Sequence, residues 1–186
     1  MRPLAVFLDR DGTINKSIDQ LYKKEQFELL PRAAEAIHKI NSEGIKVIVV
    51  TNQPVVARGL CTEKDVQRIH ELMSKELNQF NAFVDEILFC PHHPNANLVD
   101  YRKDCECRKP KIGMLKKAAE KFDLDLKKCF MIGDLTQDIK AGKDAGCKTV
   151  LVKTGHAGKD KKYEVTPDYI AEDLYEAVNI ILQENL

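Results

Sequence analysis

The sequence has no tryptophan, no net charge and no long hydrophobic run. Its 29 Lys and Arg are balanced by 29 Asp and Glu, so no whole-molecule field attracts nucleic acid. No apolar run approaches the ~18 residues of a membrane span, and the N-terminal apolar run stops at Asp9. Without a basic stripe or a secretory leader, we expect a cytoplasmic protein that binds neither nucleic acid nor membranes.

No low-complexity segment or linker divides the 186 residues. This length suits one domain with at most a small insertion. The 44% hydrophobic and 31% charged residues are typical of a globular protein. A chain of this size buries about 70% of its unfolded surface, so it needs no disulfide. We therefore expect a single domain over residues 1–186, acting as a monomer.

Apolar runs alternate with helical patterns along the chain. Each run ends abruptly at polar residues, as strands of a buried parallel sheet do; the runs are 4–8, 45–50, 129–132 and 149–152. Amphipathic patterns predict helices at 32–42, 62–80, 112–122, 136–145 and 172–183. Strands that alternate with helices form right-handed βαβ units. The sequence therefore predicts an α/β fold, a Rossmann-like doubly wound parallel sheet with helices on both faces.

Polar residues follow three of the predicted strands at the point where each strand ends. Asp9 and Asp11 follow the first run, Thr51 and Asn52 the second, and Asp134 the third. Ligands of doubly wound sheets bind outside the carboxyl ends of the strands. We therefore expect these side chains to meet in one crevice.

This combination of residues suits phosphoryl transfer. One carboxylate can attack phosphorus while a second protonates the leaving oxygen, and Mg²⁺ would be held by hard oxygen ligands from Asp9, Asp11 and Asp134. The hydroxyl of Thr51 and the ammonium of Lys109 would stabilise the transferring charge. Each residue also has a structural alternative: a turn at Asp11, a loop cap at Thr51, a solvated side chain at Lys109 and a helix N-cap at Asp134.

Four short motifs occur in order along the chain: Asp9-Arg10-Asp11-Gly12-Thr13, Thr51-Asn52-Gln53, Arg108-Lys109-Pro110-Lys111, and Gly133-Asp134 with Asp138. As a set they resemble the motifs of the haloacid dehalogenase superfamily of phosphohydrolases. The resemblance extends from residue 4 to about 152.

The resemblance implies a role for each matching residue. Asp9 matches the nucleophile, Asp11 the general acid and later base, and Asp134 the residue that completes Mg²⁺ coordination. Thr51 and Lys109 match the positions that hold the phosphoryl group. Asp138 lies either near the metal ligands or on the surface of a helix. The expected substrate contacts are Arg10, Asn52, Gln53, Arg58 and Arg108.

Three of the six cysteines cluster with histidine between residues 90 and 107, in Cys90-Pro91-His92-His93-Pro94 and Cys105-Glu106-Cys107. Three thiolates and one imidazole make a tetrahedral structural Zn²⁺ set, for which we expect Cys90, His92, Cys105 and Cys107. His93 is the competing imidazole, but alternation in an extended segment places positions 90 and 92 on the same side. Zinc in this loop would also fix Arg108 and Lys109, which follow it directly.

The Cys/His set, with Thr51-Asn52-Gln53 and Cys107-Arg108-Lys109-Pro110, resembles a narrower family, the D-glycero-D-manno-heptose 1,7-bisphosphate 7-phosphatases and the related histidinol-phosphatases. This implies a Mg²⁺-dependent phosphomonoesterase with a structural Zn²⁺. Its substrate would be a small phosphorylated sugar, a precursor of surface polysaccharide, that loses its C7 phosphate through an aspartyl-phosphate.

The segments that select the substrate depart from the family pattern. No insertion is long enough for a cap domain, so we expect a minimal cap with residues 16–24 as a flap. In that flap, Gln20-Leu21-Tyr22 replaces a short Gly-Tyr segment, and Pro54-Val55 stands where Ser-Gly is more usual. Arg58 contacts a second anionic group or lies on the surface. The alternatives are a histidinol-phosphatase, a binding module without turnover and a zinc-ribbon nucleic-acid binder, although the last lacks a basic helix.

Overall fold

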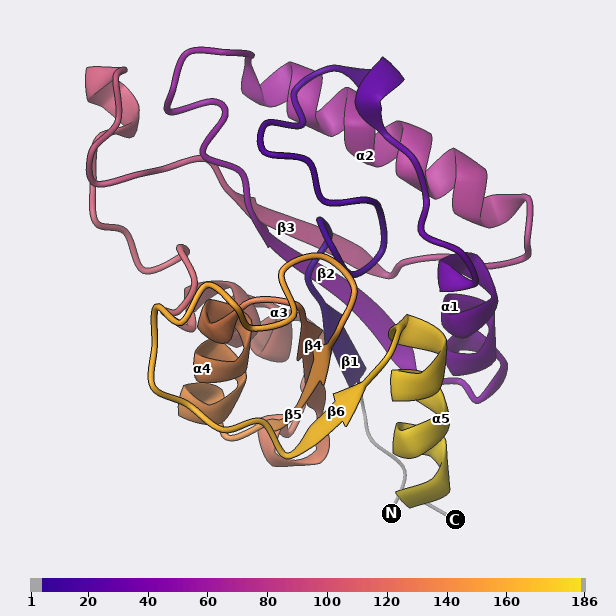
Figure 1. The fold of residues 1–186 in the computed structure, drawn as a ribbon. Coiled ribbons are helices and arrows are strands. Elements are labelled where there is room, and N and C mark those ends of the chain that lie inside the picture. Colours follow the sequence, from indigo (N-terminus) through magenta and orange to yellow (C-terminus); the bar gives the residue numbers. More distant parts are fainter. Residues whose placement is uncertain (1–4, 185–186) are drawn as a thin grey trace.

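The structure is a computed structural model that describes residues 5–184. These residues form one parallel sheet of six strands in the order β3-β2-β1-β4-β5-β6 (Figure 1). The strands are β1 Ala5–Leu8, β2 Lys46–Asn52, β3 Glu86–Cys90, β4 Phe130–Gly133, β5 Lys148–Val152 and β6 Tyr169–Ala171. The first residue of the predicted strand 4–8, and residues 1–4 and 185–186 of the predicted domain, lie outside the described residues.

The five predicted helices are confirmed to within two residues at each end. They are α1 Ala33–Ser42, α2 Glu63–Asn78, α3 Gly113–Phe122, α4 Thr136–Ala145 and α5 Leu174–Glu184. Short 3-10 helices occur at Lys24–Gln26, Val99–Tyr101 and Leu126–Lys128. The side chain of Thr62 accepts a hydrogen bond from the Asp65 backbone N–H, which caps α2.

Sequence analysis missed two strands, β3 and β6. β3 is a five-residue strand that starts at the charged Glu86 and ends at Cys90, so the metal-site pattern hid its strand character. β6 has only three residues, and Ile170 at its centre is 55% exposed. Because both strands lie at the edges of the sheet, neither has the fully buried run that marks the central strands.

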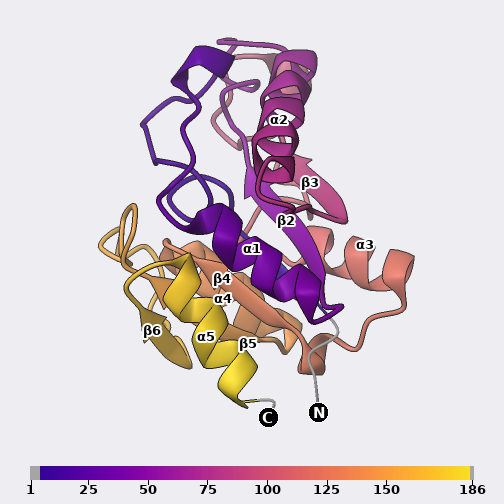
Figure 2. The same cartoon turned by 90° about the vertical axis from the view of Figure 1, so that its right-hand side faces the viewer.

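Two hydrophobic cores pack on opposite faces of the sheet. Val6 and Leu8 of β1 belong to the core that contains the apolar faces of α1, α2 and α5. Ala5 and Phe7 belong to the core that contains α3 and part of α4. Figures 1 and 2 show α1 and α5 together on one side and α3 and α4 on the other. This arrangement confirms the doubly wound fold.

The loop after β1 turns sharply toward the loop after β4. Gly12 has a φ of 84°, in the left-handed region that glycine adopts without strain. A Cβ atom at this position would lie 2.4 Å from Asp134 Oδ2, so only glycine permits this approach. Glycine at position 12 thus brings the two aspartate-bearing loops together.

No helix within residues 5–184 is long and apolar enough to cross a membrane.

Candidate active site and metal centre

A crevice of about 180 Å³ lies where the loops after β1, β2 and β4 meet. One part of its wall comes from the predicted flap, including Ser17 and Asp19, and another from Gln137 and His156. The crevice brings together residues that are far apart in sequence. Of the residues expected to act on the substrate, those that line it are Asp9, Asp11, Thr51, Asn52, Gln53, Arg58 and Arg108.

Lys109 is almost fully buried, with 1% of its surface exposed. Its ammonium lies 2.9 Å from Asp9 Oδ1 and 2.7 Å from Asp138 Oδ1. Burial works to lower the pKa of Lys109, but the two carboxylates outweigh it and raise the pKa. The alternative of a solvated surface lysine is therefore wrong, and Lys109 is a fixed positive charge beside Asp9.

Asp138 is buried, so the alternative of a carboxylate on the helix surface is also wrong. One oxygen contacts Lys109, and the other accepts a hydrogen bond from the Leu135 backbone N–H at 3.0 Å. Burial raises the pKa of Asp138 to about 7, although Lys109 opposes this shift. Leu135, not Asp134, is the N-cap residue of α4, which excludes the capping alternative for Asp134.

Asp9, Asp134 and Asp138 place carboxylate oxygens within 4.8 Å of one another. Asp134 Oδ2 accepts a hydrogen bond from the His156 backbone N–H at 2.6 Å. Asp134 Oδ1 is buried and has no hydrogen-bond partner among the described residues. Burial, and then the charges of Asp9 and Asp138, raise the pKa of Asp134 to about 8. Oxygen donors with an excess of negative charge and one unpartnered atom fit a hard divalent cation such as Mg²⁺.

The carboxylate of Asp11 is separate from this cluster and has its own donors. Asn15 Nδ2 donates to Oδ1 at 2.9 Å and Gln53 Nε2 to Oδ2 at 2.8 Å, while Arg10 donates to both oxygens. Burial works to raise the pKa of Asp11, but the Arg10 charge and these hydrogen bonds lower it below its usual value. The structure therefore favours the ionised form of Asp11.

Arg10 was predicted to contact the substrate, but it does not line the crevice. It has no exposed surface, because Nε and Nη2 donate to Asp11 and Nη1 lies 3.1 Å from His70 Nε2. A guanidinium that is enclosed in this way does not reach the crevice. Arg10 instead binds the carboxylate of Asp11.

Asn52 and Gln53 line the crevice, but their amides already have protein partners. Asn52 Nδ2 donates to the Lys109 carbonyl and Asn52 Oδ1 accepts from the Lys109 N–H, both at 3.0 Å. Gln53 Nε2 also donates to Thr51 Oγ1 at 3.0 Å, and the Gln53 backbone N–H donates to the Cys90 carbonyl at 2.8 Å. These bonds join the end of β2 to Lys109 and to the start of the 90–107 loop.

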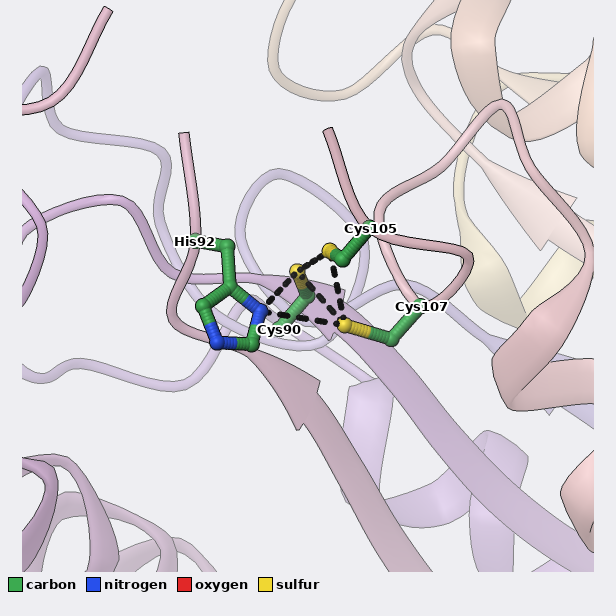
Figure 3. A group of neighbouring side chains, drawn as sticks. All are labelled: Cys90, His92, Cys105 and Cys107. Carbon is green, nitrogen blue, oxygen red and sulfur yellow. Dashed lines mark hydrogen bonds between the residues drawn. The ribbon is translucent and has the colours of Figure 1, made fainter. Parts of the chain in front are cut away.

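The 90–107 loop brings three cysteines and one histidine to a single point (Figure 3). The three sulfur atoms lie 3.0 to 3.3 Å apart, and His92 Nδ1 lies 3.4 Å from the sulfur of Cys107. The hydrogen bond with Cys90 is the main cause that lowers the pKa of Cys107, to about 5. His93 Nδ1 instead accepts the Asn95 N–H at 3.1 Å. Soft sulfur and imidazole donors in this number are typical of a structural zinc site.

Sequence analysis did not single out Asn15, His70 or His156. His70 stands among the buried positions Val66, Ile69, Met73 and Leu77 of α2, and its place within an apolar stripe was a signal of a buried imidazole. His156 acts on Asp134 through its backbone. No side-chain pattern reveals a backbone donor of this kind.

We predict that the Mg²⁺-free protein loses stability as the pH rises from about 5 to about 8. Folded Asp134 and Asp138 retain protons in this range, whereas the unfolded chain releases them near pH ~4. The free energy of unfolding therefore falls with rising pH. Mg²⁺ held by this cluster would bind its ionised carboxylates, so it should raise the melting temperature more at about pH 8 than at about pH 5.5.

The measurement is thermal unfolding after a dialysis that removes Mg²⁺ but leaves any metal at the Cys/His cluster in place. Asp134→Asn is the control: it should lose most of the Mg²⁺ effect and the part of the pH dependence that comes from Asp134, while the part that comes from Asp138 remains. A Mg²⁺-induced shift that is equally large at both pH values would contradict the assignment of this cluster.

Comparison with known proteins agrees with this geometry. The HAD-hydrolase-like family model matches residues 106–177. A D-glycero-D-manno-heptose-1,7-bisphosphate 7-phosphatase from Chlorobaculum tepidum is 37% identical over 182 residues, which cover 94% of this chain and 92% of the relative. A D-glycero-beta-D-manno-heptose-1,7-bisphosphate 7-phosphatase from Escherichia coli K12 is 38% identical over 152 residues, covering 81% and 80% of the two chains.

A solved structure extends the similarity to three dimensions. The crystal structure of D,D-heptose 1.7-bisphosphate phosphatase from B. bronchiseptica, complexed with magnesium and phosphate, has a TM-score of 0.88 and 33% sequence identity. The alignment covers 99% of both chains. Identity at this level over nearly the whole length, with the same fold, shows the family. The chain belongs to the D-glycero-D-manno-heptose-1,7-bisphosphate 7-phosphatases, a family of HAD-like phosphate monoester hydrolases.

Proposed function

We propose that this protein hydrolyses the C7 phosphate ester of D-glycero-D-manno-heptose 1,7-bisphosphate. The observation that carries the proposal is the distribution of positive charge around the crevice. Lys109 lies beside Asp9, and two further cations, Arg58 and Arg108, line the crevice. Such a crevice suits a substrate with two anionic groups. The relatives from Chlorobaculum tepidum and Escherichia coli are named for this bisphosphate.

Histidinol phosphate is the second candidate substrate, and the same charges disfavour it. It carries one phosphate and a cationic amine, which the two arginines would repel. The flap offers one carboxylate that could balance such an amine, Asp19. The substrate comparison below decides between these two esters.

In the first step, a carboxylate oxygen of Asp9 attacks phosphorus and the bond between phosphorus and the sugar oxygen breaks. The sugar oxygen takes the proton of Asp11 as it leaves. Against the effect of burial, the Arg10 charge and the hydrogen bonds to Asp11 lower its pKa and favour its ionised form, so Asp11 must gain this proton as the substrate binds. The negative charge of a nearby phosphate favours that protonation. Lys109 and the hydroxyl of Thr51 stabilise the charge on the transferring phosphoryl group.

In the second step, water attacks the phosphorus of the aspartyl-phosphate and Asp11 accepts its proton. Inorganic phosphate leaves and Asp9 is restored. The hydrogen bonds from Arg10, Asn15 and Gln53 suit this step directly, because they favour the ionised form of Asp11. The two steps therefore use the same carboxyl group in its two protonation states.

We propose that Asp9, Asp134 and the carbonyl oxygen of Asp11 hold Mg²⁺. When bound, Mg²⁺ would reduce the repulsion between the anionic nucleophile and the anionic phosphate. The unpartnered oxygen of Asp134 and the excess of negative charge support this assignment. Asp138 contributes to the same negative cluster, but both of its oxygens already have partners.

We propose that Cys90, His92, Cys105 and Cys107 hold a structural Zn²⁺. The four donors leave no open position for chemistry. A closed site of this kind acts on the reaction through the residues it fixes. Arg108 follows Cys107 directly, and its Nη1 donates to the His92 carbonyl at 3.1 Å. Zinc would therefore hold the segment from which Arg108 and Lys109 extend.

The substrate prediction is tested by the steady-state kcat/KM for both anomers of the heptose bisphosphate and for histidinol phosphate. We expect the heptose bisphosphate to be preferred by at least about tenfold, because each added charge-assisted contact contributes about 1.5–3 kcal/mol. Asp9→Asn, which removes the nucleophile, should lower kcat by at least about a thousandfold. Preference for histidinol phosphate would reverse the order of the two candidates.

The zinc prediction is tested by Cys107→Ser, with Cys61→Ser as the matched control. Cys61 is a half-exposed cysteine outside the cluster. Loss of one ligand should remove most of the zinc and lower kcat/KM by at least about tenfold, because the segment before Lys109 loses its support. Zinc content is measured by atomic absorption. Undiminished activity in a zinc-free Cys107→Ser protein would show that the site does not support catalysis.

The cytoplasmic location, the single-domain organisation of residues 1–186, the monomeric state and the role in surface polysaccharide synthesis stay predictions. Light scattering on the purified protein would report its oligomeric state.

A further inference from the structure

His70 is a buried histidine that lies outside the crevice. It is 7% exposed and occupies the buried face of α2. Its ring meets Phe89 of β3 edge-on, with 5.5 Å between the ring centroids and 68° between the ring planes. Packing alone would be served equally well by an apolar side chain. The ring nitrogen Nε2, however, lies 3.1 Å from Nη1 of Arg10.

The donor and the acceptor of the hydrogen bond between Arg10 and His70 follow from the groups involved. A guanidinium has only donors, so His70 Nε2 must accept. The imidazole is then neutral and carries its proton on Nδ1. Burial, and then the charge of Arg10, lower the pKa of His70 to about 3. His70 therefore remains an acceptor for Arg10 throughout the physiological pH range.

Arg10 directs its other side-chain donors to Asp11. Nε donates to Oδ1 at 3.0 Å, and Nη2 donates to both carboxylate oxygens at 2.9 Å. The guanidinium is planar and rigid, so a bond that fixes Nη1 also fixes the direction of Nε and Nη2. Because Arg10 has no exposed surface, loss of the acceptor at Nη1 removes the partner of a buried donor, which is costly.

We propose that His70 is a positioning residue for the general acid, holding the Arg10 guanidinium in the orientation that aligns the Asp11 carboxyl group with the leaving oxygen. This inference rests on the proposed phosphatase function. His70 itself touches neither the crevice nor the carboxylate cluster. It acts through Arg10 on the position of Asp11, so its effect on the first step is on the proton that Asp11 passes to the leaving alcohol.

The test compares esters whose leaving groups differ in their need for that proton. A sugar alkoxide requires protonation as it leaves, whereas p-nitrophenolate leaves as a stable anion. The parameter kcat/KM reports phosphoryl transfer to Asp9 and not the later hydrolysis. His70→Leu retains apolar packing but removes the acceptor, and His70→Gln retains an acceptor oxygen near the position of Nε2.

We expect His70→Leu to lower kcat/KM for the heptose bisphosphate about tenfold, through kcat with KM little changed, since misplaced catalytic groups cost this much or more. The loss for p-nitrophenyl phosphate should stay below about twofold, because no proton transfer is lost there. His70→Gln should remain within about threefold of the wild type for both esters. Melting temperature and zinc content serve as folding controls, and His70→Met replaces His70→Leu if the latter does not fold.

Equal losses for the two esters would overturn the proposal, because they would indicate a general structural effect. The proposal would also be overturned if the ratio of kcat/KM for the heptose bisphosphate to kcat/KM for p-nitrophenyl phosphate were the same in the Leu and Met variants as in the wild type. A Gln variant as impaired as these two would overturn it as well. If the wild type hydrolyses p-nitrophenyl phosphate but not the heptose bisphosphate, the proposed substrate fails. The same comparison is then made with the alkyl phosphate that the protein does hydrolyse.

A second measurement does not depend on activity. In ¹⁵N NMR spectra of the full chain at about pH 7, the His70 signals are assigned from their absence in His70→Gln. We expect a neutral ring with its proton on Nδ1, the tautomer that accepts at Nε2. A proton on Nε2 would overturn the proposal whatever substrate the enzyme uses.

Discussion

The burial of the Lys109 ammonium between two carboxylates is the interaction on which the rest of the site depends. Asp9 follows β1 and Asp138 lies in the first turn of α4, and both meet this one cation. Breaking a buried pair by removing one partner typically costs about 3–5 kcal/mol, so the loop after β1, the start of α4 and Lys109 stabilise one another. Asp134 adds a further carboxylate to the cluster. The remaining negative charge is what makes the cluster suited to a divalent cation.

Lys109 has a long side chain, so its ammonium is positioned precisely only if the backbone of Lys109 is held in place. Asn52 binds both the N–H and the carbonyl of Lys109, which ties that residue to the end of β2. The neighbouring Arg108 binds the carbonyl of His92 in the Cys/His loop. A loop with little regular structure thus gains two supports, from a strand and from a candidate metal site, which reduces its conformational freedom.

The two carboxylates of the Asp9-Arg10-Asp11 motif pair with different cations. Asp9 lies against Lys109, and Asp11 lies against Arg10. A shared cation would couple the two carboxyl groups, whereas separate partners suit the proposed roles, in which Asp9 remains a nucleophile while Asp11 gains and loses a proton. Environments that differ in this way are a general means of assigning acid and base roles to two similar groups. His70 of α2 links the Arg10–Asp11 pair to β3, because it accepts a hydrogen bond from Arg10 and packs against Phe89.

The order of motifs along the chain determined most of the site. Because parallel strands end at the same edge of the sheet, Asp9, Thr51 and Asp134 had to meet there, and the one-residue spacings in Cys90-Pro91-His92 and Cys105-Glu106-Cys107 indicated the candidate ligands of the 90–107 loop. Only the tertiary structure decided that Arg10 is enclosed and that Asp138 is buried, and it alone placed His70 beside Arg10. These outcomes depend on which face of α2 and α4 packs against neighbouring segments, and local sequence does not specify a partner sixty residues away.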